Sequence, residues 1–405
     1  MKLKISSPIA RPQPHCHKGM YLLILLQLAL LLSACAPILP IETTPSLTGY
    51  LPLTSTPIPG EAHIPAPSPS AVPALSSTST QARQSLPTEV RKASGLSIDV
   101  MEGSGPPYET VISLPVGEGN VQYRGLSASE GLIEGPNALG VFSDGTFGLA
   151  DPAAGSLLRF SPAGELLNRV ELRAVGIHML SGMAISGNDF LVLEAGFGPD
   201  PQVYRIYRVT PSGEVSATYD LPDWARLESG LTGISAWQTG EVFVELGGSR
   251  TYLFMTAAGD LAAQPVVAPV GPGNIRLQAP QRNLAYRITT RFTYDLGSVR
   301  LLTVNEDGSF FVVREDVIDQ QVIRVDQTVH WLDERGEQLG IARMPQDECL
   351  YYVPGNLAVG PAGQVYGLIP RQDRLDIVHL IFYQQLDALH PEADIPYVKG
   401  YLEVQ

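Results

Sequence analysis

The sequence contains little cysteine: its 405 residues include only Cys16, Cys35 and Cys349. The first two lie within the N-terminal 35 residues, so the rest of the chain has a single thiol. One thiol excludes an intrachain disulfide framework. Asp347 and Glu348 precede it, and neighbouring negative charge disfavours a reactive thiolate. We therefore interpret Cys349 as an inert core or strand residue.

The sequence also lacks the short motifs of several common chemistries. It has no HExxH zinc motif, no GxSxG nucleophile elbow, no Walker loop and no dinucleotide-binding fingerprint. The later histidines, His178, His330, His379 and His390, show no zinc-ligand spacing. A Ser-His-Asp triad is assembled in space rather than along the chain, so sequence alone does not test that route. These absences favour a non-catalytic protein.

Positive charge is scarce. The chain has 27 Lys and Arg residues against 41 Asp and Glu, a formal net charge of −14. Residues 1–34 carry four basic side chains and no acidic one, so their removal would move the charge from −14 to −18. A chain this acidic is repelled by phosphate backbones. We expect no nucleic-acid partner.

No apolar run is long enough to span a bilayer. The longest N-terminal run, Met20 to Leu32, has 13 residues, whereas a membrane-spanning helix needs about 20. Lys2, Lys4, Arg11 and Lys18 precede it, and a basic segment before a short apolar core is typical of a signal peptide.

The segment that follows this run resembles the lipobox of bacterial lipoproteins. It reads Leu32, Ser33, Ala34 and Cys35. The resemblance covers only the first 35 residues. It implies that residues 1–34 are a signal peptide and that Cys35 is lipidated, with fatty acids such as palmitate. A lipid anchor of two or more acyl chains holds a protein stably at a membrane. We therefore expect an extracytoplasmic protein that contacts the membrane through this anchor alone.

The next segment is rich in proline, serine and threonine. Residues 36–85 contain ten prolines, fifteen Ser or Thr residues and three charged side chains. Such a composition buries too little apolar surface to offset the entropy lost on ordering. We predict a disordered tether over residues 35–94 and one globular domain over residues 95–405.

The globular part repeats one plan. Five segments consist of a strand, a tight turn and a second strand, and most are followed by a second hairpin. The five first turns contain Gly145, Gly187, Gly240, Gly308 and Gly363. Units of four antiparallel strands pack radially in a β-propeller. We predict an all-β propeller of six blades, with five or seven blades or a β-sandwich pair as alternatives. The strands "ETVISLPVG" and "PYVKGYLEVQ" are expected to share the closing blade.

One unit resembles a known repeat. Residues 136–165, "GPNALGVFSDGTFGLADPAAGSLLRFSPAGE" with its leading glycine, are similar to an NHL repeat, and residues 182–214 and 354–369 match in part. The resemblance implies a propeller related to the NHL and gluconolactonase-like superfamily, without implying one activity. Asp151 follows the second strand of this unit, and we interpret it as a structural turn acid, because Asp side chains cap nearby backbone N–H groups.

The competing interpretation is a metal at the propeller axis. Gluconolactonase-like propellers hold a divalent cation through carboxylate and Asn side chains of different blades, and hard cations such as calcium prefer oxygen ligands. The candidates here are Glu194, Glu245, Asn305 and Glu315. A bound cation would activate water for hydrolysis of a lactone or phosphoester. Their spacing alone is not diagnostic.

The function favoured by the sequence is a binding or scaffolding module at the cell envelope. The alternatives are a metal-dependent hydrolase of the lactonase type and an assembly factor that docks on other envelope proteins. The partners expected are an envelope protein or a glycan. Trp224, Trp237, Tyr351 and Tyr352 are aromatic candidates for a binding face, although core packing is the simpler role for Trp237. Arg314 is expected to be a paired loop charge beside Glu315.

Overall fold

The structure is a computed structural model of the whole chain. It describes residues 89–405 except 94–95, 104, 118, 127–132, 196–203, 222–230, 238, 247–249, 272–273, 280–283, 295, 320–323 and 387–401. The chain divides into two units, residues 1–79 and 80–405, and all described residues belong to the second. The expected signal peptide, the lipidated Cys35 and most of the expected tether lie outside the described residues. Strand β1 (Glu89–Ala93) shows that regular structure begins before residue 95.

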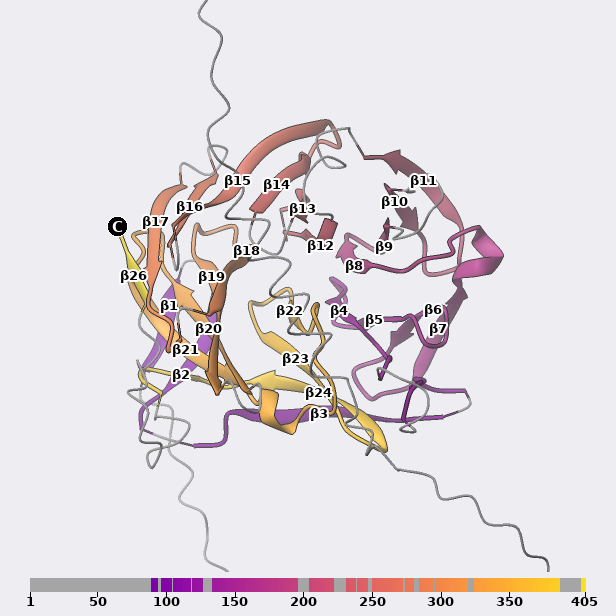
Figure 1. Cartoon of the computed structure of the whole chain (residues 1–405), viewed down its shortest axis with the longest axis horizontal. Helices are drawn as coiled ribbons and strands as arrows, with labels where there is room; N and C mark the ends of the chain where they lie inside the picture. Colours follow the sequence, from indigo (N-terminus) through magenta and orange to yellow (C-terminus); the bar gives the residue numbers. More distant parts are fainter. Residues whose placement is uncertain are drawn as a thin grey trace, which may run out of the picture. The chain divides into compact units, whose positions relative to one another are not determined.

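The described part of the chain is a ring of five sheets, the arrangement of a β-propeller (Figure 1). Neighbouring strands in these sheets run antiparallel, except that β2 and β25 pair in parallel. We name each blade by its innermost strand. The β4 blade contains β4 (Ala138–Val141), β5 (Phe147–Asp151), β6 (Ser156–Phe160) and β7 (Leu166–Glu171). The β8 blade contains β8 (Gly182–Ser186), β9 (Asp189–Ala195), β10 (Tyr204–Val209) and β11 (Val215–Asp220). The all-β propeller predicted from the sequence is confirmed.

The next two blades carry additional strands on their outer edges. The β12 blade contains β12 (Leu231–Ala236), β13 (Val242–Leu246), β14 (Arg250–Met255) and β15 (Leu261–Gly271), extended by β16 (Asn274–Ala279), β17 (Leu284–Thr290) and β26 (Leu402–Val404). The β18 blade contains β18 (Gly297–Val304), β19 (Phe310–Asp319), β20 (Arg324–Leu332) and β21 (Gln338–Met344), extended by β25 (Phe382–Tyr383), β2 (Leu96–Met101) and β1.

The last blade closes the ring. The β22 blade contains β22 (Leu357–Val359), β23 (Val365–Pro370) and β24 (Arg374–Leu380) from late in the chain, and β3 (Tyr108–Pro115) from its beginning. Ile377 of β24 pairs with Ile112 of β3. The N-terminal strand therefore closes the ring as predicted. The C-terminal strand does not share that blade, because β26 pairs with β17 instead.

The prediction of six blades is wrong for the described residues, which form five. The count of six assumed that each blade uses about 50 residues. The segment after residue 271 folds as the hairpin β16–β17, which pairs with the outer edge of β15 and starts no blade of its own. Strands β1, β2, β25 and β26 likewise extend existing sheets. The additional chain length therefore widens two blades.

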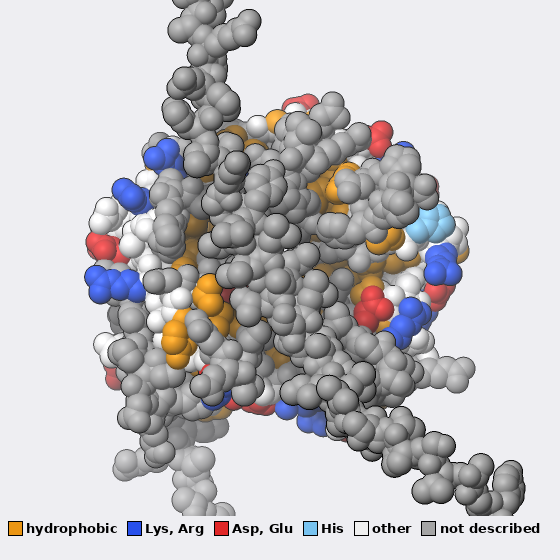
Figure 2. Space-filling view, in the orientation of Figure 1, with side chains coloured by type: hydrophobic (Ala, Val, Ile, Leu, Met, Phe, Trp, Pro, Cys, Tyr) orange, Lys and Arg blue, Asp and Glu red, His pale blue; other side chains and the backbone are white. Residues whose placement is uncertain are grey.

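The hydrophobic core is divided among the interfaces between neighbouring blades. Five clusters of buried side chains each join two adjacent blades. Between the β4 and β8 blades, for example, Phe142 packs edge-to-face on Phe190, with ring centroids 5.1 Å apart. Because no sheet covers its own faces, each blade depends on both neighbours for its stability. On the face seen in Figure 2, charged side chains of the described residues are visible around the periphery.

The predicted hairpin turns recur with one backbone geometry. All five first turns place glycine at positive φ, at Gly145, Gly187, Gly240, Gly308 and Gly363. The described residues include two short 3₁₀ helices, η1 (Leu172–Val175) and η3 (Gln346–Glu348). Within the residues described, no helix has both the length and the apolar character needed to cross a membrane.

Candidate functional site

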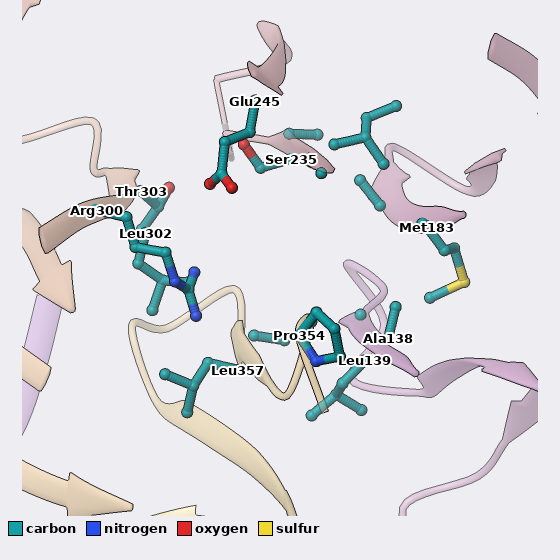
Figure 3. A pocket seen from close by; sticks show the side chains of 18 of the residues that line it. Ala138, Leu139, Met183, Ser235, Glu245, Arg300, Leu302, Thr303, Pro354 and Leu357 are labelled. Atoms are coloured by element: carbon teal, nitrogen blue, oxygen red, sulfur yellow. The ribbon is translucent and has the colours of Figure 1, made fainter. Parts of the chain in front are cut away.

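The innermost strands of all five blades surround a cavity at the axis of the ring (Figure 3). Its volume is about 340 Å³. β4, β8, β12, β18 and β22 each contribute to the wall, together with residues just before β22. A site built on rigid inner strands holds its side chains in fixed positions, which is the arrangement that binding sites need.

The cavity differs in polarity from one end to the other. Equivalent blades place the starts of their first strands at one end of the axis. We call this end the polar mouth, and define it by residues at or near those starts together with two acids from second strands: Asn137, Ser181, Thr232, Glu245, Ser298 and Glu315. The apolar end is defined by Val141, Ile185, Ala236 and Val359, and the small hydroxyl side chains of Ser235 and Thr303 lie one residue before the ends of their strands. Between them lie apolar side chains such as Leu139, Met183 and Leu357. A ligand that fits this cavity has a polar and an apolar part.

Glu315 is held rigidly at the polar mouth. Ser298, its cross-strand partner on β18, donates from Oγ to Glu315 Oε2 at 2.9 Å. Gln327 Nε2 donates to Glu315 Oε1 at 2.6 Å, and the Tyr352 hydroxyl donates to the same oxygen at 3.2 Å. Behind this group, Asn356 Nδ2 donates to Gln327 Oε1 at 2.7 Å. Donors on three sides fix the orientation of this carboxylate.

Glu245 reaches the polar mouth from the second strand of its blade. A β-bulge interrupts the register between Leu231 and Gly233, so that Gly233 lies opposite Glu245. A Cβ on Gly233 would lie 3.9 Å from Glu245 Oε1, so the glycine leaves the space beside this carboxylate open. Thr232 Oγ1 donates to Glu245 Oε1 at 2.9 Å. Figure 3 shows the carboxylate directed into the cavity.

Three polar atoms that line the cavity are buried without a hydrogen-bond partner among the described residues. They are Arg300 Nη2, Thr303 Oγ1 and Asn137 Oδ1. Arg300 is the most consequential, because a guanidinium stays charged at every ordinary pH. Figure 3 shows its side chain entering the cavity from β18, on the wall next to the one that carries Glu245. A buried polar group without a partner is costly, and a ligand would supply one.

The other predicted acids serve the architecture. Asp151 Oδ1 accepts from the Ala154 backbone N–H at 3.0 Å, and its Oδ2 accepts from the Gln122 N–H at 2.8 Å. Burial raises the pKa of Asp151, and these two hydrogen bonds oppose the shift. These are the contacts that a structural turn acid makes.

Glu194 and Asp316 make the same kind of contact in other blades. Glu194 Oε1 accepts from the backbone N–H groups of His178 and Met179, and its Oε2 accepts from the Tyr207 hydroxyl at 2.7 Å. Asp316 Oδ1 accepts from the Thr293 N–H at 2.8 Å. Each acid therefore fixes the segment that leads into the first strand of its blade. Neither lines the axial cavity.

The four predicted metal ligands do not form one cluster. Glu245 and Glu315 line the cavity, and Glu194 does not. Asn305 lies in the β18–β19 turn, at the opposite end of that hairpin from the pair Ser298–Glu315, and its Nδ2 donates to Ser309 at 2.9 Å. Across the described part of the chain, no three His, Cys, Asp or Glu side chains are grouped so as to hold a metal ion. The described residues therefore do not fit the cation site that the resemblance implied.

Several other residues singled out from the sequence have packing roles. Trp237 is buried against Phe243, with ring centroids 3.9 Å apart, as core packing predicts. Tyr351 and Tyr352 lie in the loop before β22 rather than in a strand. Only the second of the two lines the cavity, whereas Tyr351 packs edge-to-face on Tyr123. Trp224 lies outside the described residues.

Two expectations hold in part. Arg314 is a paired charge as expected, bonded to Asp316 at 2.7 Å, but it lies within β19 rather than in a loop. Cys349 follows η3 instead of lying in a strand, and it packs against a core cluster, as the core alternative predicts. Burial raises the pKa of its thiol to about 12, and the neighbouring Glu348 carboxylate adds to this effect. The expectation of an inert thiol therefore agrees with its surroundings.

Sequence reasoning missed Arg300. It stands in the strand "SVRLLTV", where one basic residue among apolar ones is typical of any half-exposed strand. No local signal distinguishes a side chain directed at the axis from one directed at solvent. Only the closure of the ring places this arginine in the same cavity as Glu245.

Comparisons with known proteins add likeness of fold alone. No protein-family model matches the chain, and no curated protein matches it in sequence. Among solved structures, a streptogramin B lyase matches at 15% identity over 67% of this chain and 99% of its own, with a TM-score of 0.35. Virginiamycin B lyase from Staphylococcus aureus, solved with quinupristin, matches at 15% identity over 64% and 99%, with a TM-score of 0.35. A gluconolactonase from Xanthomonas campestris matches at 12% identity over 69% and 99%, with a TM-score of 0.33. Likenesses this distant carry no argument about activity.

Proposed function

We propose that this chain is an extracytoplasmic, lipid-anchored β-propeller that binds a small molecule in its axial cavity. The observation that carries the proposal is the set of buried, unpartnered polar atoms on the cavity wall, Arg300 Nη2 foremost. Ligand sites are typically concave, mostly apolar and of about 300–1,000 Å³, with a few well-placed polar groups. The axial cavity, at about 340 Å³, is of this size, and its wall presents polar and apolar surface in similar measure.

Binding explains the cavity better than metal-dependent hydrolysis does. A cation site needs several oxygen ligands converging on one point. Here Glu315 is already engaged by hydroxyl and amide donors, and Arg300 brings a positive charge to the same cavity. A cation would be repelled by this guanidinium. An organic molecule with both polar and apolar parts would meet no such conflict.

The binding proposal predicts one saturable site for 1-anilinonaphthalene-8-sulfonate, a dye with apolar rings and one anionic group, on the purified full-length chain. Replacing Ser235, which lines the cavity, by phenylalanine fills the space and should abolish that site. The matched control is Ser216→Phe, on the exposed outer strand β11, which should leave it intact. Fluorescence titration measures both. Equal dye binding by all three proteins would contradict the proposal.

The same titration distinguishes a metal-dependent site. We expect neither exhaustive EDTA treatment nor added calcium to change dye binding or the melting temperature, because no three His, Cys, Asp or Glu side chains of the described residues are grouped to hold a cation. A melting temperature that falls with EDTA and recovers with calcium would instead favour the hydrolase alternative. A ligand at 100 times its Kd stabilises a fold by about 2.7 kcal/mol, which a melting curve detects readily.

The anchor is tested separately. Replacing Cys35 by serine removes the only acceptor thiol of the lipobox-like segment. We expect the variant to lose incorporation of labelled palmitate and to leave the membrane fraction. The control is Cys349→Ser, which should leave both unchanged. Palmitate incorporation that persists without Cys35 would show that the lipoprotein interpretation is wrong.

A further inference from the structure

The polar mouth presents the carboxylates of Glu245 and Glu315, and Arg300, two residues after Ser298 on β18, enters the same cavity. These three charged side chains do not neutralise one another. Arg300 has no ion pair or hydrogen bond among the described residues, and its Nη2 is buried. Glu245 accepts from Thr232 through Oε1 alone, so its Oε2 accepts no hydrogen bond from described residues. Arg300 and Glu245 enter the same cavity from neighbouring blades (Figure 3). An unpaired donor and an unpaired acceptor therefore face one space.

Glu315 is not an equivalent acceptor. Its two oxygens already receive hydrogen bonds from Ser298, Gln327 and Tyr352. These donors stabilise its negative charge and hold it in place. Tyr352 is 53% exposed, so this aromatic ring also stands at the entrance with an accessible face. The groups left for a ligand are the guanidinium of Arg300 and the free oxygen of Glu245.

The charges decide what kind of ligand fits. An anion would pair with Arg300, but it would leave the free oxygen of Glu245 without a donor and would place a second negative charge near it, so an anionic molecule uses only part of the site. A simple cation would pair with Glu245 but would leave the buried Nη2 without a partner. A zwitterion satisfies both groups, because its carboxylate pairs with the guanidinium and its ammonium pairs with Glu245. Both contacts are charge-assisted hydrogen bonds, which are the strong ones.

The remaining wall of the cavity indicates that the rest of the ligand is apolar. Beyond the polar mouth, the cavity is lined by Leu139, Met183, Ile234 and Leu357, and burial of apolar surface there is favourable. We propose that the axial cavity binds a hydrophobic amino acid or a short hydrophobic peptide with free termini, its carboxylate on Arg300 and its ammonium on Glu245. This inference rests on the proposed function and names the ligand class of that same site.

The test uses isothermal titration calorimetry on the full-length chain with L-leucine and L-leucyl-L-leucine. We expect at least one of them to bind. For whichever binds, acetylation of the amine and amidation of the carboxylate should each weaken binding roughly 10- to 100-fold, the loss of one charged hydrogen bond. In the Arg300→Gln variant, amidation should no longer weaken binding, whereas acetylation should still weaken it. In the Glu245→Gln variant, acetylation should no longer weaken binding, whereas amidation should still weaken it. Arg205→Gln, at an exposed side chain of β10, is the matched control and should change neither penalty.

The outcomes separate this inference from the function on which it rests. Selective loss of each penalty in its own variant supports the inference, because a variant that merely unfolds loses all binding at once. Equal binding of the doubly blocked N-acetyl-L-leucine amide overturns it. If neither leucine nor leucyl-leucine binds, but Ser235→Phe still abolishes a dye site, the ligand class is wrong and the binding function stands. If neither probe binds and Ser235→Phe leaves dye binding unchanged, the ligand class and the binding function are both wrong.

Discussion

Replacing Asp316 by asparagine should lower the free energy of unfolding by about 3–5 kcal/mol, the usual cost of breaking a buried ion pair. Asp316 and Arg314 are both 0% exposed and lie 2.7 Å apart. Asparagine keeps the shape of the side chain and removes its charge. Arginine cannot lose its proton at accessible pH, so the guanidinium would stay buried without its counter-charge.

The position of this ion pair increases the expected effect. Arg314 also donates to Thr290 Oγ1 and to the Arg291 carbonyl, and Asp316 accepts from Thr293. The pair therefore fixes the segment that returns from the extra hairpin β16–β17 to the inner strand β18. Loss of the charge should loosen this segment and the edge of the blade together.

Urea unfolding monitored by tryptophan fluorescence measures the change. The control is Asp220→Asn, whose ion pair with Arg205 joins side chains that are 71% and 46% exposed. Exposed pairs contribute little, so its unfolding midpoint should not move measurably. The double variant Arg314→Met/Asp316→Leu should recover part of the loss, because apolar side chains can replace a buried ion pair. Equal behaviour of the two asparagine variants would contradict a buried pair.

Acid should destabilise the fold through His330. This side chain is completely buried on β20, and burial lowers its pKa to about 4. The nearby Arg314 lowers the pKa further, whereas the hydrogen bond with Gln338 and the charge of Asp326 raise it. His330 Nδ1 is joined to Gln338 Oε1 at 2.8 Å, and its Nε2 to Thr328 Oγ1 at 3.1 Å.

The sign of the effect follows from proton binding. An unfolded histidine has a pKa near 6.5, so between pH 6.5 and about 4 the unfolded chain binds more protons at this position than the folded chain. Stability therefore falls as the pH is lowered through this window. The slope is about 1.4 kcal/mol per pH unit, and the total loss is roughly 3 kcal/mol.

The measurement is the free energy of unfolding from pH 7 to pH 4 in wild type and in His330→Gln. Other groups titrate in the same range, including Asp151, whose pKa burial raises. The difference between the two slopes isolates His330, whatever the variant does to stability at neutral pH. Parallel curves for the two proteins would show that His330 is not neutral and buried at pH 7.

Local sequence is enough to predict most of the architecture. A tight hairpin turn needs positive φ, and glycine adopts it cheaply. The five repeated turns around Gly145, Gly187, Gly240, Gly308 and Gly363 therefore mark the first hairpin of each blade in the sequence itself. The role of Asp151 is predictable in the same way, because an Asp side chain bonds backbone N–H groups within its own turn. Its contact with Ala154 is of this kind.

The blade number does not follow from local sequence. Whether β16 and β17 begin a new blade or widen an old one depends on which strand edge they meet. The pairing of strand edges depends on residues far apart in the chain. Backbone N–H and C=O groups are alike in nearly all residues, so the local sequence does not specify which edge a strand joins. The same holds for β26, which the repeat pattern assigns to the closing blade and which instead pairs with β17.

The candidate site depends still more on tertiary structure. Glu194 and Glu245 occupy similar positions in their repeats. Glu245, which lies opposite a bulge in β12, nevertheless lines the axial cavity, whereas Glu194 binds the backbone of a preceding segment. Arg300 carries no local signal at all. The sequence by itself determined the strands, the turns and the repeated order of the propeller, because these depend on backbone conformation within a few residues. The closure of five blades decided which side chains share the axis, because that depends on contacts between residues far apart in the chain.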